Sequence, residues 1–126
     1  MSKDKKDEKD SMGKLEELFL KSRTIMLYGE INQKVAREFC TKLQLLASGS
    51  DDDITVYINS PGGVTCDGLA IFDTMQMLRA DVSTICVGAA ASMGTILLAA
   101  GQKGKRYALL NPTIHLHLST IHILPA

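Results

Sequence analysis

The sequence lacks an excess of charge of either sign. Its 126 residues include 14 Lys and Arg and 14 Asp and Glu. A chain whose formal net charge is zero gives no electrostatic reason to expect nucleic acid or an anionic membrane as a partner. The length allows one domain with a real hydrophobic core and leaves little room for a second.

Cysteines and long apolar runs are also scarce. The three cysteines, Cys40, Cys66 and Cys86, are odd in number and lie in apolar or helical surroundings. This pattern favours free thiols in a reducing compartment over a disulfide framework or a metal site. No apolar run reaches the roughly 18 residues of a membrane span, and the charged N-terminus has no signal-peptide core. We therefore expect a soluble, cytoplasmic protein that binds no metal.

The first 21 residues are expected to stand apart from the rest. Residues 2–11 alternate in charge and contain no apolar side chain, which predicts disorder. Between residues 12 and 21, Leu15, Leu18 and Phe19 recur at helical spacing. This predicts a short amphipathic helix whose apolar stripe packs on the body of the protein or on a neighbouring subunit.

Strand and helix patterns alternate through the rest of the chain. Strand patterns occupy residues 24–28, 54–58, 82–87, 107–110 and 113–118, and helix patterns follow Asn32, run over 67–79 and cover 96–100. The alternation predicts an α/β domain with a largely parallel sheet. Functional sites in such sheets form beyond the carboxyl ends of the strands.

A serine stands at one of these strand ends. Ser92 lies between the 82–87 strand and the apolar helix, with Ala90 and Gly94 two residues to either side. The small-x-Ser-x-small pattern is related to the nucleophile elbow, a tight turn that exposes a serine hydroxyl. Amides at the start of the helix favour an oxyanion nearby. The alternative is that Ser92 only caps the helix.

A second strand end carries Ser60-Pro61-Gly62-Gly63. The two glycines form either a simple turn or a close backbone approach, with N–H groups available to a carbonyl oxygen.

Two further motifs are interpreted as solvated turns: the acids at 51–53, rather than a calcium site, and the basic loop at 101–106, rather than a phosphate site.

Several segments in order resemble the Clp protease (ClpP) family of proteolytic subunits. They are residues 57–64, 68–76, 81–86, 90–94 and 99–107, and the similarity runs from about Ser22 to Leu118. The resemblance implies a ClpP/crotonase-like fold of repeated β-α units over residues 22–118, after residues 1–21 and before a divergent tail at 119–126. It also implies a serine peptidase acting inside two stacked seven-membered rings. A separate AAA+ ATPase would unfold the protein substrates and use the ATP, so that this subunit needs no cofactor.

The resemblance also assigns roles to individual residues. Ser92 matches the nucleophile, His117 matches the general base, and Gly63 and Met93 match the positions whose amides form the oxyanion hole. Strand alternation alone puts His115 on the same face as His117 and does not choose between them. The family pattern selects His117, and His122 receives no role.

The sequence departs from the family pattern at both ends. Residues 1–20 do not match the axial segment that meets the ATPase, and residues 118–126 differ from the family's continuation. No Asp follows His117, so the triad aspartate and the C-terminal handle region are missing from the chain. We therefore expect a C-terminally truncated member with impaired peptidase activity.

Two other functions stay open from the sequence. One is a non-catalytic or unassembled ClpP-like subunit. The other is a crotonase-like acyl-CoA enzyme, which also uses strand-end glycine amides as an oxyanion hole. A crotonase-like activity would need neither Ser92 nor His117, so substitution of either residue separates it from a peptidase.

Overall fold

The computed structural model describes residues 2–116. The elements in chain order are α1 (Lys3–Lys21), β1 (Thr24–Tyr28), α2 (Gln33–Gly49), β2 (Ile54–Ser60), α3 (Thr65–Met77), β3 (Val82–Ala91), α4 (Met93–Ala99), β4 (Arg106–Ala108) and β5 (Thr113–His115). After α1, strands and helices alternate as far as β4. The predicted α/β class is confirmed, and most predicted elements begin within two residues of the observed ones.

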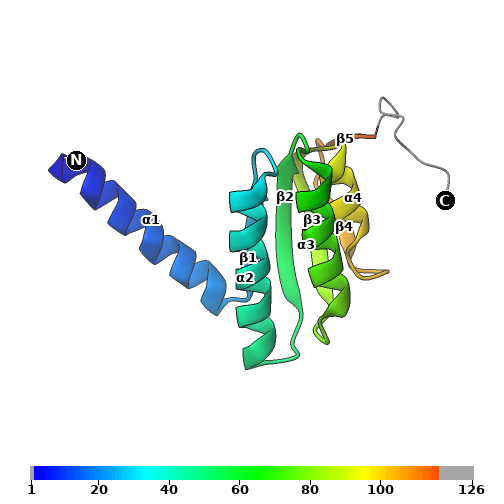
Figure 1. Ribbon diagram of the computed structural model, residues 1–126, viewed down its shortest axis with the longest axis horizontal. Helices are drawn as coiled ribbons and strands as arrows, with labels where there is room; N and C mark the ends of the chain where they lie inside the picture. The colour runs from blue at the N-terminus through cyan, green and yellow to red at the C-terminus, as the bar shows by residue number, and fades with distance from the viewer. Residues whose placement is uncertain (1, 117–126) are drawn as a thin grey trace.

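The strands form one parallel sheet. Its order is β1-β2-β3-β4, and β5 pairs with the second half of β3. Right-handed crossovers between strands added in sequential order place the connecting helices on the same face. Accordingly α2 and α3 lie side by side against one face of the sheet, and α4 follows beside α3 (Figure 1). The predicted mostly parallel sheet is confirmed.

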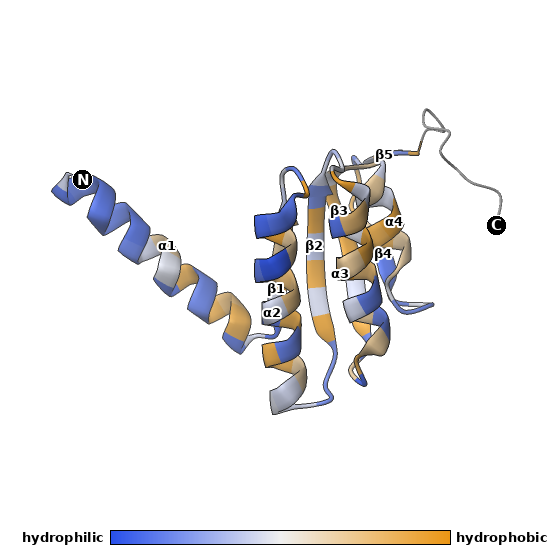
Figure 2. Ribbon diagram, viewed as in Figure 1, coloured by the Kyte–Doolittle hydropathy of each residue, from blue (hydrophilic) through white to orange (hydrophobic). Residues whose placement is uncertain are grey.

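The core lies between this sheet face and the helices. In β2 the side chains of Ile54, Val56 and Ile58 are fully buried, while the alternate residues are half-buried. The buried stripe of α2 faces them, and its members are Ala36, Phe39, Leu43 and Leu46. Figure 2 shows the alternation as apolar and paler bands along β2. Full burial of one such aliphatic side chain stabilises the fold by about 1.5–3 kcal/mol.

Strand β3 is longer than the sequence predicted. The pattern ended at residue 87, whereas β3 continues to Ala91 and so includes residues that were interpreted as part of the serine turn. The pairing with β2 jumps from Ile58–Cys86 to Ser60–Ala90, so β3 bulges between them. Gly88 lies in the bulge with φ 83°, a conformation that suits glycine. Residues Ala89 to Ala91, which follow the bulge, pair with β5.

The predicted disorder of residues 2–11 is wrong in this structure. Helix α1 is continuous from Lys3 to Lys21, and the Ser2 side chain accepts a hydrogen bond from the Lys5 amide at its start. None of its residues is buried, and it extends away from the sheet (Figure 1). Lys and Glu are strong helix formers, so intrinsic propensity and the N-cap favour the helix without a core.

Candidate active site

Ser92 occupies a strained turn between β3 and α4. Its backbone has φ 54° and ψ −123°, a region that non-glycine residues rarely enter. The residue stands at the N-cap position of α4, but its side chain makes no capping hydrogen bond. The interpretation of Ser92 as a simple side-chain cap is therefore wrong. A strained serine between a strand and a helix is the geometry of the nucleophile elbow.

The end of β2 packs directly against this turn. A Cβ atom added to Gly62 would lie 2.8 Å from Ser92 Cβ and 2.9 Å from the Ala91 carbonyl oxygen. A Cβ atom added to Gly94 would lie 2.8 Å from the Ser60 carbonyl oxygen. Real Cβ atoms do not approach so closely, so both positions need glycine. The small residues around Ser92 are therefore needed because the end of β2 packs closely against the turn that follows β3.

The Gly62–Gly63 peptide is held so that one amide stays free. The Ile31 amide donates to the Gly62 carbonyl at 2.9 Å. In a trans peptide the N–H points opposite to the C=O, so the Gly63 N–H points away from Ile31. Over residues 2–116, neither this N–H nor that of Met93 donates a hydrogen bond. Two unbonded amides beside a serine suit the binding of an oxyanion.

The side chain of Met93 anchors the second amide. It is 3% exposed, and a Cβ atom added to Gly68 would lie 2.5 Å from its Cε. The start of α4 is therefore packed tightly against α3. This packing fixes the position of the Met93 amide next to Ser92.

Ser60 is a site residue that the sequence analysis did not assign. Its side chain is 1% exposed, and its hydroxyl donates to the Gly29 carbonyl at 2.7 Å and accepts from the Gly62 amide at 3.1 Å. The hydroxyl thus joins the end of β1 to the glycine turn. A serine two residues before the glycine pair was the available signal, since short polar side chains often bond nearby backbone amides.

Strand β5 reaches the serine turn from a distant part of the sequence. His115 pairs with Ala91 across the β3–β5 ladder, and its carbonyl accepts the Ser92 amide at 2.9 Å. The same carbonyl lies 2.9 Å from the Thr95 hydroxyl. His117, the predicted base, lies outside the described residues, and its role stays a prediction. The backbone that leads to it is nevertheless anchored at Ser92.

The cysteines do not take part in this arrangement. All three are free thiols, and Cys86 is fully buried in β3. Burial raises the pKa of the Cys86 thiol, because the thiolate would lose its hydration. Within residues 2–116 no three His, Cys, Asp or Glu side chains group as metal ligands. Over the same range, no helix is both long and apolar enough to cross a bilayer.

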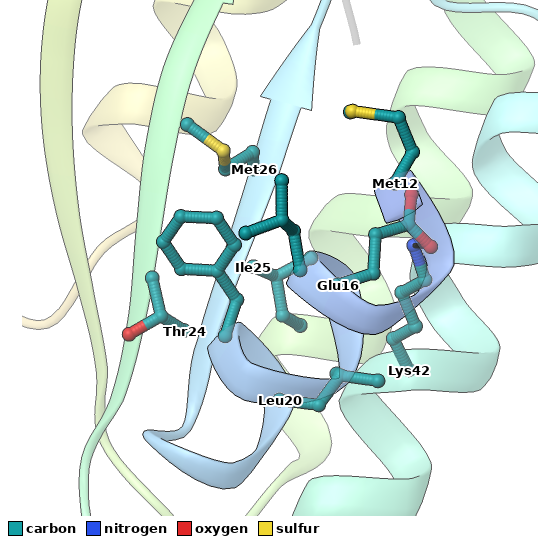
Figure 3. A pocket seen from close by; sticks show the side chains of 9 residues that line it. Met12, Glu16, Leu20, Thr24, Ile25, Met26 and Lys42 are labelled. Atoms are coloured by element: carbon teal, nitrogen blue, oxygen red, sulfur yellow. Dashed lines mark ion pairs between the residues drawn. The ribbon is translucent and has the colours of Figure 1, made fainter. Parts of the chain in front are cut away.

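A separate apolar pocket lies between α1 and β1. Its walls include Met12, Phe19 and Met26, and the ion pair of Glu16 with Lys42, 3.8 Å apart, lies beside it (Figure 3). The pocket is on the edge strand of the sheet, whereas Ser92 follows β3 in the interior of the sheet order. It contains none of the predicted site residues.

The fold and the serine turn together define an α/β protein with a strained serine at the carboxyl end of a strand of a parallel sheet. A family model described as Clp protease matches residues 5–123, and the chain belongs to this family. Three curated relatives from Dehalococcoides mccartyi strains BAV1, 195 and CBDB1 are each named "ATP-dependent Clp protease proteolytic subunit". Each is 57% identical over 101 residues, which cover 79% of this chain and 50% of the relative. The chain thus spans about half the length of these relatives.

Proposed function

We propose that this chain acts as a proteolytic subunit of an ATP-dependent Clp protease, a serine-type endopeptidase. The observation that carries the proposal is the strained Ser92 turn, with the free Gly63 and Met93 amides beside it. The names of the relatives support the substrate class, since proteins are what a protease cleaves. The family resemblance supports His117 as the base, and the structure brings the backbone of His115 to the Ser92 turn.

In the proposed reaction, the Ser92 hydroxyl oxygen bonds to the carbonyl carbon of a peptide as its proton passes to His117. The π electron pair moves to the carbonyl oxygen, which accepts hydrogen bonds from the Gly63 and Met93 amides. Each such donor contributes roughly 3–4 kcal/mol in serine proteases. The C–N bond then breaks, and His117 protonates the leaving amine.

Hydrolysis of the resulting ester completes the cycle. Water bonds to the acyl carbon as His117 takes its proton, and collapse of the second intermediate breaks the bond to Ser92. The peptide acid leaves, and Ser92 regains its proton from His117. No residue is assigned here as the acid that orients His117.

The partners belong to the same proposal. Assembly into stacked seven-membered rings would enclose Ser92 in a chamber, and an AAA+ unfoldase would deliver unfolded proteins and consume the ATP. The subunit itself would need no cofactor, and its place would be the cytoplasm. Measurement of native mass, alone and with a full-length relative, tests the assembly.

The activity is tested with two probes. The purified chain is incubated with a fluorogenic peptide and, separately, with a fluorophosphonate that forms a covalent bond to activated serines. We expect phosphonate labelling and peptide cleavage, both abolished by Ser92→Ala. The matched control is Ser48→Ala, since Ser48 lies near the C-terminal end of α2 and its hydroxyl donates to the Leu45 carbonyl in the same helix.

Two results would contradict the proposal. Labelling that persists in Ser92→Ala would show that another residue reacts. Absence of both labelling and cleavage in the unmodified chain would favour the non-catalytic alternative for residues 1–126.

A further inference from the structure

We propose that Ser60 is a positioning residue, whose buried hydroxyl fixes the orientation of the Gly62–Gly63 peptide and thereby where the Gly63 N–H points. The inference rests on the proposed function, because it assumes that this N–H binds the oxyanion. Ser60 acts through the glycine turn, Gly62 and Gly63, rather than on the substrate. The hydrogen bonds of its hydroxyl and its place before Pro61 carry the inference.

The Ser60 hydroxyl replaces a donor that the β1–β2 ladder lacks. In a parallel ladder, a residue donates its N–H to one carbonyl of the neighbouring strand and accepts the N–H two residues further along that strand. The Gly29 amide donates to the Asn59 carbonyl at 2.9 Å, so the regular donor to the Gly29 carbonyl would be residue 61. Residue 61 is proline, which has no N–H. The Ser60 hydroxyl donates to that carbonyl instead, at 2.7 Å.

The same hydroxyl binds the glycine turn. Its oxygen accepts the Gly62 amide at 3.1 Å. A carbonyl only accepts and an amide only donates, so the one hydroxyl proton goes to Gly29 and a lone pair faces Gly62. Ser60 is 1% exposed, so both bonds are made away from bulk water. Loss of the hydroxyl would therefore take a partner from a carbonyl and from an amide at the same place.

Gly62 is held by hydrogen bonds on both sides. Its amide donates to Ser60, and its carbonyl accepts the Ile31 amide at 2.9 Å. Gly62 and Gly63 have φ 101° and 155°, and neither has a Cβ atom to limit its dihedral angles. The peptide plane between two glycines rotates at low steric cost. The two hydrogen bonds consequently select the orientation that turns the Gly63 N–H away from Ile31.

The orientation of this peptide matters because the glycine turn lies against Ser92. A Cβ atom added to Gly62 would lie 2.8 Å from Ser92 Cβ, so a movement of the glycine turn changes the position of the Gly63 amide relative to the serine. Oxyanion donors act at about 2.7–3.1 Å from the oxygen that they bind. Loss of the Ser60 hydroxyl should therefore lower the reactivity of Ser92 more than loss of a similar bond elsewhere.

The test compares Ser60→Ala with Ser83→Ala in the full chain. Ser83 is the matched control because it is also a buried strand serine, and its hydroxyl donates to the Lys105 carbonyl at 3.0 Å, at the opposite end of β3 from Ser92. The chains carry isotope-labelled glycine, and amide hydrogen exchange is followed by NMR. We expect Gly62 to exchange about fivefold faster in Ser60→Ala and to change within about twofold in Ser83→Ala.

Reaction with the fluorophosphonate separates positioning from stability. The reagent forms a P–O bond to Ser92 as fluoride leaves, and its phosphoryl oxygen is expected to occupy the oxyanion position. We expect labelling to be at least about tenfold slower in Ser60→Ala and near normal in Ser83→Ala. In the unmodified chain, labelling should also move the Gly63 amide proton resonance downfield, because the N–H then donates to that oxygen. The movement should be smaller in Ser60→Ala.

A second variant decides the case in which Ser60→Ala is unstable. In the double variant Ser60→Ala, Pro61→Ala, position 61 supplies the N–H that the ladder lacks. The Gly29 carbonyl then regains a donor, whereas the Gly62 amide does not regain an acceptor. We expect the unfolding midpoint in urea to rise above that of Ser60→Ala while labelling stays at least about tenfold slow. Labelling that recovers together with the midpoint would show that Ser60 acts only through stability.

The outcomes distinguish this inference from the proposed function. Unchanged Gly62 exchange in Ser60→Ala would overturn the inference, and so would unchanged labelling of that variant when the unmodified chain labels. If the unmodified chain does not label at all, the proposed function fails, and Gly62 exchange alone decides. In that case faster exchange in Ser60→Ala supports the hold of Ser60 on the glycine turn, and unchanged exchange refutes it.

Discussion

The contact between the glycine turn and Ser92 makes Gly62→Ala the most informative single change. Gly62 has φ 101°, which costs an L-residue about 1–2 kcal/mol. The new methyl group would also lie 2.8 Å from Ser92 Cβ and 3.1 Å from the Met93 amide nitrogen. Such crowding in a packed region costs about 1–3 kcal/mol more. The expected loss in free energy of unfolding is therefore about 2–5 kcal/mol.

A matched control isolates the crowding. Gly104 has φ 87°, and a Cβ atom added there meets nothing within 4 Å. Gly104→Ala should lose only the conformational part, about 1–2 kcal/mol. Urea unfolding followed by circular dichroism gives both free energies, and the difference between the two variants measures the contact with Ser92.

The same pair of variants links the contact to reactivity. Relief of the clash requires the serine turn or the glycine turn to move, so fluorophosphonate labelling should decrease at least about tenfold in Gly62→Ala and remain near normal in Gly104→Ala. Equal losses of stability in the two variants, with equal labelling, would refute the close approach of Gly62 to Ser92.

Two further predictions concern contacts remote from Ser92. The Arg23 guanidinium donates to four backbone carbonyls between Leu46 and Asp53, at 2.8 to 3.4 Å. Lysine cannot make this set of bonds, so Arg23→Lys should lower the free energy of unfolding by about 1–3 kcal/mol. Urea unfolding measures this change, and an unchanged midpoint contradicts the prediction. The hydrogen bond of Lys105 to Asp53 at 2.7 Å, and then that to Asp81, raise the lysine pKa above its ordinary 10.5. Its contribution to stability is thus complete below pH 10.5 and is lost as pH rises through the raised value. Thermal unfolding as a function of pH should show this loss in the unmodified chain and a weaker one in Lys105→Met, and identical profiles would disprove it.

Local patterns predicted most of the fold because they report burial directly. The alternation in β2 and the stripe of α2 follow from one buried face in each element, and Asn32 caps α2 as expected by accepting from the Val35 amide at 2.9 Å. The apolar pattern did not predict the helix that residues 3–11 form. There the helix has no buried face to produce a stripe, so only propensity and the Ser2 cap indicate it.

The sequence by itself determined that Ser92 stands between a strand and a helix with small neighbours, and that a glycine pair ends another strand. Those features depend on residues adjacent in the chain. Only the tertiary structure decided that Gly62 touches Ser92, that Ser60 links the glycine turn to Gly29, and that Thr95 bonds β5. Each of these is a contact between segments that are separate in the sequence. Such contacts depend on how the strands pair and where β3 bulges, and neither leaves a periodic signal in the sequence.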